Sequence, residues 1–192
     1  GDALCDLLES VAPRAPLILP GSPYRGLSAF EPEHRAMFFG RTAETRAVVE
    51  RLRTETFVIV AGDSGVGKSS LCRAAVLPAV AEKSLGGRRW QVTTLMPGAH
   101  PLARIDAALA ERRTDEGLLV FVDQLEELLT IAAPDEAAQF AQRLAELVVA
   151  TSSVRVLASA RSDFLGRLAG LPGLGELVGR ALFLLGPLND RG

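Results

Sequence analysis

The feature that most constrains the fold of this chain is an uninterrupted GxxxxGK[ST] match, Gly62-Asp63-Ser64-Gly65-Val66-Gly67-Lys68-Ser69. Glycines let the backbone curl so that successive N–H groups point at one anion, and a following helix adds its positive N-terminus. The apolar run 57–61 leads into the motif as a buried strand would, and a helix-compatible segment leads out. A Rossmann loop would need GxGxxG, whereas the glycines here follow GxxGxG. The motif therefore predicts a phosphate-binding loop between a strand and a helix.

The positions of this loop have expected parts in binding a nucleoside triphosphate. Lys68 is one of only two lysines among 21 basic residues, and we expect its ammonium to reach the β and γ phosphates. We expect the Ser69 hydroxyl to bind Mg²⁺. The predicted nucleotide-binding residues of the loop are Gly62, Asp63, Ser64, Gly65, Val66, Gly67, Lys68, Ser69 and Ser70.

Apolar runs alternate with amphipathic segments along the rest of the chain. The runs predict strands at 57–61, 90–95, 118–122, 154–158 and 181–185. Helical spacing predicts helices at 42–53, from the loop to about 76, around 102–109 and at 134–150. Thr42 is the expected N-cap of the first helix, and Pro78 is expected to stop the second. Such alternation predicts the α/β class: a three-layer α/β/α P-loop NTPase core with a parallel sheet of about five strands.

A second acidic motif, Asp123-Gln124-Leu125-Glu126-Glu127, follows the third apolar strand. Because ligands bind beyond the carboxyl edge of a parallel sheet, we expect Asp123 to hold Mg²⁺, directly or through a water. If a helical turn begins at Gln124, Glu126 or Glu127 can fold back toward the γ-phosphate. That carboxylate would orient the attacking water or accept its proton, with Glu126 as the first candidate. The alternative is that both glutamates are solvent-facing charges on a helix.

The order of elements also bears on the class of NTPase. One predicted strand, 90–95, lies in the chain between the loop strand and the acidic strand. This count favours the ASCE, AAA+-like branch, which has an inserted strand, an added glutamate and includes the ATPases. The NKxD guanine reader of GTPases is absent, which favours adenine. Arg161, at the end of the fourth strand, is placed to sense the γ-phosphate or, alternatively, to pair with Asp163 or with an acid at an interface.

Composition and the two ends of the sequence restrict partners and compartment. Lysine and arginine total 21 against 23 aspartate and glutamate, which argues against a nucleic-acid or anionic-membrane surface. No apolar run reaches the ~18 residues of a transmembrane helix, and no signal peptide is visible, so we expect a cytoplasmic protein. A leucine-rich start and four prolines in 13–23 predict an N-terminal helix and linker over 1–23. The NTPase domain is expected at 24–188, with a truncated tail at 189–192, as a piece of a longer protein.

Together these motifs resemble the STAND class of signal-transduction ATPases, and the bacterial novel-STAND group in particular. The resemblance covers residues 24–188 and rests on the order and spacing of short motifs. These are Tyr24-Arg25-Gly26-Leu27, Phe38-Phe39-Gly40-Arg41, the loop at 62–69, Val122-Asp123-Gln124-Leu125-Glu126-Glu127-Leu128, Arg161-Ser162-Asp163-Phe164-Leu165-Gly166-Arg167-Leu168 and Gly186-Pro187-Leu188. The resemblance implies that Phe39, Gly40 and Arg41 lie against the adenine, that Asp123 is the Walker B acid and that Arg161 is the sensor.

The resemblance also implies a function, cofactors and partners. ADP would favour a closed resting state and ATP an open, self-associating homo-oligomer, with slow hydrolysis resetting the switch. ATP or ADP and Mg²⁺ would be the cofactors, and effector and WD40-like repeat domains would flank the domain in the full protein. The catalytic residues would be Lys68, Asp123, Glu126, Glu127 and Arg161.

Two other functions stay open from the sequence. Gln124 stands where many AAA+ proteins place the catalytic glutamate, which suits an ATP-dependent scaffold that never hydrolyses its nucleotide. Arg88-Arg89-Trp90 is the only basic-aromatic patch, and it would serve an AAA+-like DNA-associated ATPase. We expect Trp90 to lie in the core, which makes a nucleic-acid partner the less favoured alternative.

Overall fold

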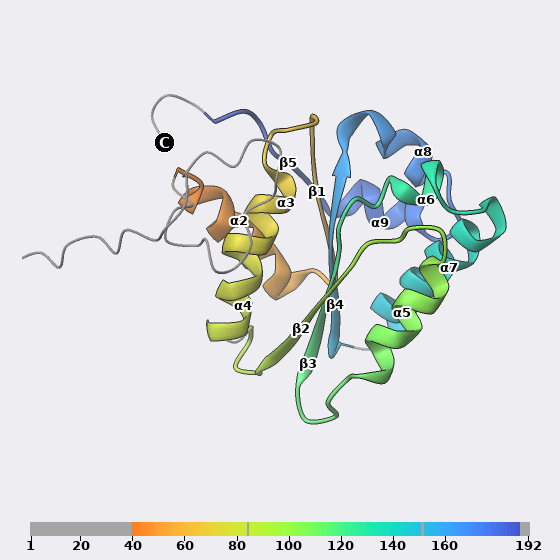
Figure 1. Cartoon of the computed structure of the whole chain (residues 1–192). Helices are drawn as coiled ribbons and strands as arrows, with labels where there is room; N and C mark the ends of the chain where they lie inside the picture. The colour runs from red at the N-terminus through yellow and green to blue at the C-terminus, as the bar shows by residue number, and fades with distance from the viewer. Residues whose placement is uncertain (1–39, 84, 151, 189–192) are drawn as a thin grey trace, which may run out of the picture.

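Five strands form one sheet in the part of the chain that the structure, a computed structural model, describes: residues 40–83, 85–150 and 152–188 (Figure 1). The strands are β1 (Phe57–Gly62), β2 (Trp90–Leu95), β3 (Gly117–Val122), β4 (Val154–Arg161) and β5 (Leu182–Leu184). All neighbouring pairs run parallel, so the predicted strands and the α/β class are confirmed. The predicted N-terminal helix and linker (1–23), Phe39 and the tail 189–192 lie outside the described residues.

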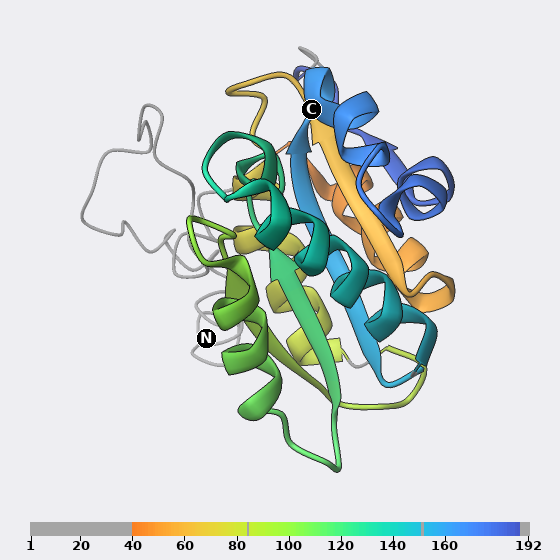
Figure 2. The same ribbon diagram turned by 90° about the vertical axis from the view of Figure 1, so that its right-hand side faces the viewer.

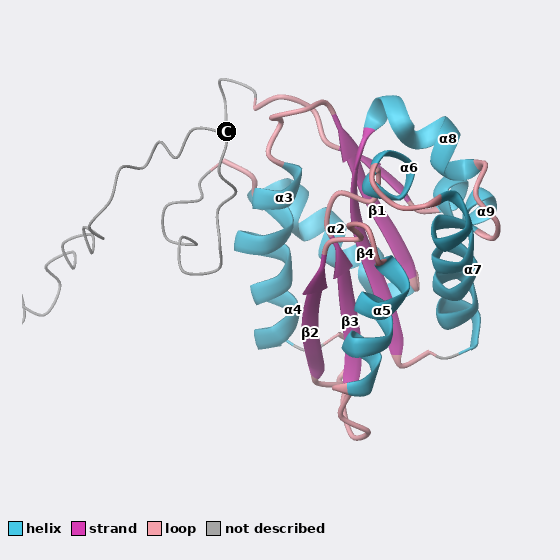
Figure 3. Cartoon of the chain, turned by 45° about the vertical axis from the view of Figure 1, so that its right-hand side comes forward, coloured by secondary structure: helices cyan, strands magenta, loops and turns pink. Residues whose placement is uncertain are grey.

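The strands follow the order β2-β3-β4-β1-β5, the predicted ASCE, AAA+-like arrangement. β4 lies between β1 and β3, with Gly62 in register with Arg161 and Val122 in register with Ala158. The strand inserted in space between the loop strand and the acidic strand is therefore β4, whereas segment 90–95 forms the edge strand β2. The carboxyl ends of β1, β3 and β4 consequently lie side by side at one edge of the sheet (Figure 3).

Helices cover both faces of the sheet and give the predicted three layers (Figures 1 and 2). Side chains of β1 alternate between the two faces, with Ile59 in one apolar cluster and Val60 in the other. In the helix that begins at Thr42, Val48 and Leu52 lie four residues apart on one face and are fully buried. One face carries α2 (Thr42–Thr54), α3 (Lys68–Leu71) and α4 (Leu77–Lys83), and the other carries α5 (Pro101–Ala110), α6 (Glu127–Thr130), α7 (Pro134–Ala150), α8 (Leu165–Ala169) and α9 (Leu174–Arg180).

The helix after the glycine-rich loop continues past Pro78, so the prediction that it ends before this proline is wrong. It consists of α3, a π-helical turn η2 (Cys72–Val76) and α4, which ends at Lys83. Proline has no N–H to donate, and its ring clashes with the carbonyl four residues earlier in a regular helix. The π turn changes the hydrogen-bond register, because the Leu77 N–H bonds to the Cys72 carbonyl. Pro78 therefore falls in the first turn of α4, where proline is tolerated.

Two further local features differ from the sequence prediction. Thr42 is the first residue of α2 rather than its cap, and Arg41 occupies the N-cap without a side-chain cap bond. Helices α8 and α9 have no counterpart in the prediction, because both are short and lie in a glycine-rich segment without a clear helical period. Among the described helices, none is long and apolar enough to cross a membrane.

Candidate functional site

The glycine-rich loop leaves the carboxyl end of β1 and enters α3 (Figure 3). Gly65 and Gly67 have φ values of 79° and 93°, in the left-handed region that other residues rarely adopt. Gly62 is needed for a different reason, since a Cβ there would lie 2.5 Å from the Leu185 carbonyl oxygen and 2.9 Å from Val66 Cγ1. The glycines of the motif thus serve both the curl of the loop and its close packing on the end of β5.

Lys68, the first residue of α3, folds back over this loop. Its Nζ donates to the carbonyl oxygens of Gly62 and Asp63 at 3.0 and 2.7 Å. Burial lowers the pKa of the Lys68 ammonium below its ordinary value, against the attraction of nearby Glu126. An ammonium has three N–H donors, so the two bonds to the loop fix the position of the cation and leave a donor for an anion.

Asp123 follows β3 and is 1% exposed. Its Oδ1 accepts hydrogen bonds from the hydroxyls of Ser69 and Ser159, at 2.7 and 2.6 Å. Its Oδ2 accepts a bond from Arg73 Nε at 3.0 Å, and Arg73 Nη2 also lies 3.0 Å from this oxygen. The structure thus brings the predicted metal-site residues, Ser69 and Asp123, into direct contact. The side-chain donors to the carboxylate come from α3, η2 and β4.

The turn after Asp123 is strained and is held by β4. Gln124 has a φ of 57°, and among the described residues it alone combines a side chain with positive φ. Left-handed backbone costs a residue with a Cβ roughly 1–2 kcal/mol. Ser159 secures the turn, because its Oγ accepts the Gln124 N–H at 2.9 Å and its carbonyl accepts the Leu125 N–H at 2.8 Å. The helix begins only at Glu127, after the turn, rather than at Gln124.

Glu126 is half-buried on the wall of a cavity of about 410 Å³ that is also lined by Lys68, Ser69 and Arg161. Its Oε2 accepts a hydrogen bond from the backbone N–H of Arg161 at 3.3 Å. Burial raises the pKa of the Glu126 carboxyl above its ordinary value, although the Arg161 N–H and the Lys68 ammonium oppose this effect. A carboxylate with a raised pKa beside the phosphate loop is suited to accept a proton from water.

Glu127 lines the same cavity, but its carboxylate is engaged elsewhere. Its Oε2 accepts the backbone N–H of Gly98, in the loop between β2 and α5, at 2.9 Å. Glu127 is 9% exposed and Glu126 is half-buried, so neither is the solvent-facing charge of the alternative interpretation. The bond to Gly98 lets Glu127 hold that loop in place, whereas Glu126 is the glutamate whose charge acts on Lys68.

Arg161 ends β4 at the rim of the cavity, and its guanidinium pairs with Asp163. Nε donates to Oδ1 at 3.0 Å and Nη2 donates to Oδ2 at 2.8 Å, while the guanidinium lies 5.3 Å from the centre of the Phe164 ring. The bond and charge of each partner raise the pKa of Arg161 and lower the pKa of Asp163. The pairing foreseen as the alternative to a sensor is therefore present, on a side chain that also lines the cavity.

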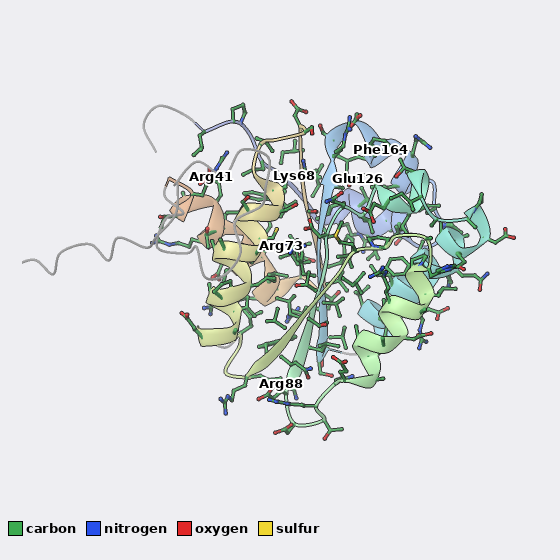
Figure 4. The ribbon with its side chains drawn as sticks, viewed as in Figure 1. Arg41, Lys68, Arg73, Arg88, Glu126 and Phe164 are labelled. Carbon is green, nitrogen blue, oxygen red and sulfur yellow. The ribbon has the colours of Figure 1, made fainter. Side chains whose placement is uncertain are left out.

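Arg41 is 5% exposed and connects three segments on the side of Lys68 away from Glu126 (Figure 4). Its Nη1 donates to Glu44 Oε1 at 2.7 Å, and its Nη2 donates to the carbonyls of Gly186 and Val66 at 2.8 and 3.3 Å. These segments border a second cavity of about 520 Å³, which shares Ser64 and Gly65 with the first cavity. Of the three residues predicted to contact adenine, Arg41 lines this cavity, Gly40 precedes it with a φ of 84°, and Phe39 lies outside the described residues.

The residues present fit a nucleoside phosphate with Mg²⁺. Open space surrounds the positions that Cβ atoms would take at Gly65 and Gly67, so the loop offers backbone rather than side chains to an anion. The Ser69 hydroxyl donates a hydrogen bond to Asp123, so the lone pairs of its oxygen remain for a hard cation such as Mg²⁺. Ser70, the last predicted loop residue, lies in α3 and lines neither cavity.

Two residues of this site are missing from the sequence prediction. Arg73 follows Ser69 by four residues, so both share one face of the helix, and this spacing is a signal that could have indicated it. Ser159 is a polar residue within an otherwise apolar stretch of β4, and a buried hydroxyl requires a partner. Asp63, a predicted loop residue, gains a partner from the same region, since its Oδ1 accepts the Ser162 hydroxyl at 2.8 Å.

The chain is similar to known proteins in both sequence and structure. The family model described as Novel STAND NTPase 1 matches residues 23–192. The Aeropyrum pernix ORC1 protein, solved in complex with DNA, matches with a TM-score of 0.58 and 17% identity over 78% of this chain and 46% of that chain. The Aeropyrum pernix ORC2 protein, solved as ADPNP-ADP complexes, matches with a TM-score of 0.50 and 17% identity over 77% of this chain and 48% of that chain. No curated protein sequence matches. The chain spans about half the length of these solved structures, and at this identity the likeness shows the fold alone.

Proposed function

This chain belongs to the novel STAND NTPase family, and we propose that it is an ATP-binding switch that hydrolyses ATP slowly. The observation that carries the proposal is the grouping of Lys68, Ser69 and Glu126 around one cavity of about 410 Å³, with Asp123 placed 2.7 Å behind the Ser69 hydroxyl. A cation for phosphate, an oxygen ligand for Mg²⁺ and a carboxylate for water are the groups that phosphoryl transfer to water requires.

In this proposal each residue has a defined part. The loop N–H groups and Lys68 bind the phosphates, while Ser69 is the metal ligand and Asp123 orients its hydroxyl. Bound Mg²⁺ supplies charge neutralisation at the phosphate oxygens. Glu126 positions the attacking water and accepts its proton, and Arg161 neutralises charge at the γ-phosphate once it leaves Asp163.

We propose the second cavity for the adenosine half of the nucleotide. Leu184, Leu185 and Pro187 line it beside Arg41, and an apolar wall suits the face of a purine. The ORC2 structure named above was solved as ADPNP-ADP complexes, which supports adenine as the base for a chain of the same fold. Phe39 and Gly40 complete the proposed adenine contacts.

Two features favour slow turnover, as a switch requires. Asp163 binds the Nε and Nη2 edge of the Arg161 guanidinium, so this edge must leave Asp163 before it can meet a phosphate. The Glu126 carboxylate accepts the Arg161 N–H, and this bond opposes the rise in its pKa and so reduces its readiness as a base. We propose that ATP favours self-association and ADP the resting state, within a longer protein that carries effector and repeat domains. A ligand shifts such an equilibrium only by its differential affinity for the two states.

A scaffold that binds ATP without hydrolysing it is the second candidate, and the same engagement of Glu126 and Arg161 favours it. Phosphate release that exceeds background and disappears in Glu126→Gln would exclude this candidate. No specific observation favours DNA as a partner of this chain. The ORC1 structure holds DNA, but here Trp90 is 6% exposed and its Nε1 donates to the Leu85 carbonyl, and Arg88 lies at the opposite end of the sheet from Lys68 (Figure 4).

The proposal is tested by measuring ATP and ADP affinity in Lys68→Ala. Loss of a charged hydrogen bond to phosphate should weaken binding by about 30-fold or more. Lys83→Ala, which removes the only other lysine, is the matched control and should bind as the wild type does. Unchanged affinity in Lys68→Ala would contradict the assignment of the site.

A further inference from the structure

Arg73 lies directly behind the proposed metal site, and we propose that it is a positioning residue that fixes Asp123 and makes nucleotide binding less dependent on Mg²⁺. This inference rests on the proposed binding of Mg²⁺ and nucleotide at the loop. It concerns a side chain that contacts Asp123 next to the proposed metal site.

The contacts of Arg73 point to this role. Arg73 Nε and Nη2 both lie 3.0 Å from Oδ2 of Asp123, while the hydroxyls of Ser69 and Ser159 occupy Oδ1. Three protein hydrogen bonds and the charge of the guanidinium thus act on the two oxygens of this carboxylate. A cation at Ser69 therefore meets Asp123 as the acceptor behind the hydroxyl rather than as a free ligand.

The local helix geometry directs Arg73 at this carboxylate. Ser69 and Arg73 are four residues apart, so both project from the same side of the helix that follows the loop. The π turn η2 (Cys72–Val76) contains Arg73, and such turns occur frequently at functional sites. In Figure 4 Arg73 extends from this helix toward the sheet. Asp123 directly follows β3 in the chain.

The charge of the pair has a direct consequence for Mg²⁺. Asp123 is 2% exposed at its side chain and Arg73 is 21% exposed, so water screens their interaction only weakly. The guanidinium neutralises the carboxylate before any metal arrives. A divalent cation at Ser69 thus meets an ion pair without net charge instead of an uncompensated carboxylate. The positive charge of Arg73 lies on Oδ2 of Asp123, whereas Ser69 contacts Oδ1. Removing the charge of Arg73 should strengthen Mg²⁺ binding, and replacing it by another cation should not.

If the Arg73–Asp123 ion pair only stabilises the fold, a different result is expected. Breaking a buried pair destabilises the fold, but it leaves no specific signature on the metal. The measurement that separates the two roles is the ratio of ADP affinity in Mg²⁺ to ADP affinity in EDTA, because a general loss of stability affects both conditions alike.

The experiment measures this ratio with a fluorescent N-methylanthraniloyl ADP in the wild type and three variants. We expect the ratio to rise about fivefold or more in Arg73→Gln, which keeps a donor but removes the charge. Arg73→Lys keeps the charge and should stay within about twofold of the wild type. Arg53→Gln breaks an exposed pair with Glu50, whose side chains are 45% and 71% exposed, and is the control with an unchanged ratio.

A second readout uses the wild-type protein, so the proposal does not depend on the folding of Arg73→Gln. The Nε–H resonance of Arg73, identified by its loss in Arg73→Lys, should shift when Mg²⁺ is added to the ADP complex and stay in place when EDTA is added instead. An unchanged ratio in folded Arg73→Gln, or a wild-type Nε–H that ignores Mg²⁺, would overturn the proposal. Absence of any ADP binding to the wild type would contradict the proposed nucleotide site itself, so the two failures are distinguishable.

Discussion

Oε2 of Glu126 accepts the backbone N–H of Arg161 across 3.3 Å, which links the carboxylate proposed as base to the strand that ends in the proposed sensor. Glu126 comes from the turn after β3 and Arg161 from the end of β4, and these two strands are neighbours in the sheet. Because the bond uses the backbone of Arg161, movement of the Arg161 side chain alone need not break it. The base can therefore stay in place while the guanidinium exchanges partners.

Replacing Glu126 by glutamine should separate binding from hydrolysis. We expect ATP turnover to fall about 100-fold, the usual scale for losing a general base, while ATP affinity stays near that of the wild type. Phosphate release and equilibrium binding measure the two quantities. Glu127→Gln is the matched comparison, because its amide oxygen can still accept the Gly98 N–H. Equal loss of turnover in both variants would contradict the assignment of Glu126 as the base.

The pH dependence of turnover should report the environment of Glu126. Only the ionised carboxylate can accept a proton, so the rate rises as pH increases through its pKa. Since burial raises that pKa, the rising limb should lie at higher pH than for an ordinary glutamate. A rate profile under saturating ATP measures the limb, and Glu126→Gln should lose it. If the rise in rate with pH remains unchanged in Glu126→Gln, it belongs to the titration of another group.

The same pKa shift predicts a change in stability. When a carboxyl has a higher pKa in the folded than in the unfolded state, the folded protein becomes less stable as pH rises between the two pKa values. This loss begins at about pH 4.3, the pKa of glutamate in the unfolded chain. Glu126→Gln should therefore unfold at a higher temperature than the wild type near pH 8, and the difference should shrink toward pH 4. Thermal melts without nucleotide at both pH values test this. A lower midpoint for the variant at pH 8 would show that the carboxylate gains more from its bonds than it loses by burial.

Removing the carboxylate of Asp163 should release Arg161. In Asp163→Ala we expect the affinity for ATP to rise relative to ADP, because the freed guanidinium can reach the additional phosphate. Competition binding with the two nucleotides measures the ratio. The double variant Arg161→Ala, Asp163→Ala is the control and should abolish the gain. A lower ratio in Asp163→Ala would mean that Asp163 orients Arg161 for binding instead of withholding it.

Gly62→Ala should destabilise the fold by about 1–3 kcal/mol, the usual cost of overpacking. Its Cβ would lie 2.5 Å from a backbone oxygen of Leu185, and backbone at the end of a sheet strand yields little. Gly166→Ala in α8 is the matched control, because nothing lies within 4 Å of its Cβ position. Alanine is the better helix former, so the control should be neutral or slightly stabilising. Denaturant titrations of both variants provide the comparison, and similar stabilities would contradict the packing argument.

The sequence was sufficient for features that depend on local pattern. Continuous apolar runs such as 118–122 identify strands buried on both faces, and β3 is buried along its whole length. The side-by-side ends of β1, β3 and β4 follow from that pattern only after the sheet order is known. β4 follows β3 in the chain but lies between β1 and β3 in the sheet, and no local signal shows that it separates the loop strand from the acidic strand.

Other features depend on contacts between distant segments and escaped prediction. The π turn before Pro78 is one, because the register change that accommodates the proline is a property of the packed helix. The environment of Asp123 is another, since Ser159 lies 36 residues away and Arg73 lies 50 residues away in sequence. The sequence predicts which groups meet phosphate and metal, whereas the residues that contact those groups became visible only in three dimensions.

Arg41 joins the beginning of α2 to the Gly186 carbonyl and to the Val66 carbonyl within the glycine-rich loop. One guanidinium thus holds together three segments that lie far apart in the chain: the start of α2, the glycine-rich loop and the residues that follow β5. A substitution at Arg41 would therefore loosen all three segments at once, although only one of them belongs to the phosphate-loop motif.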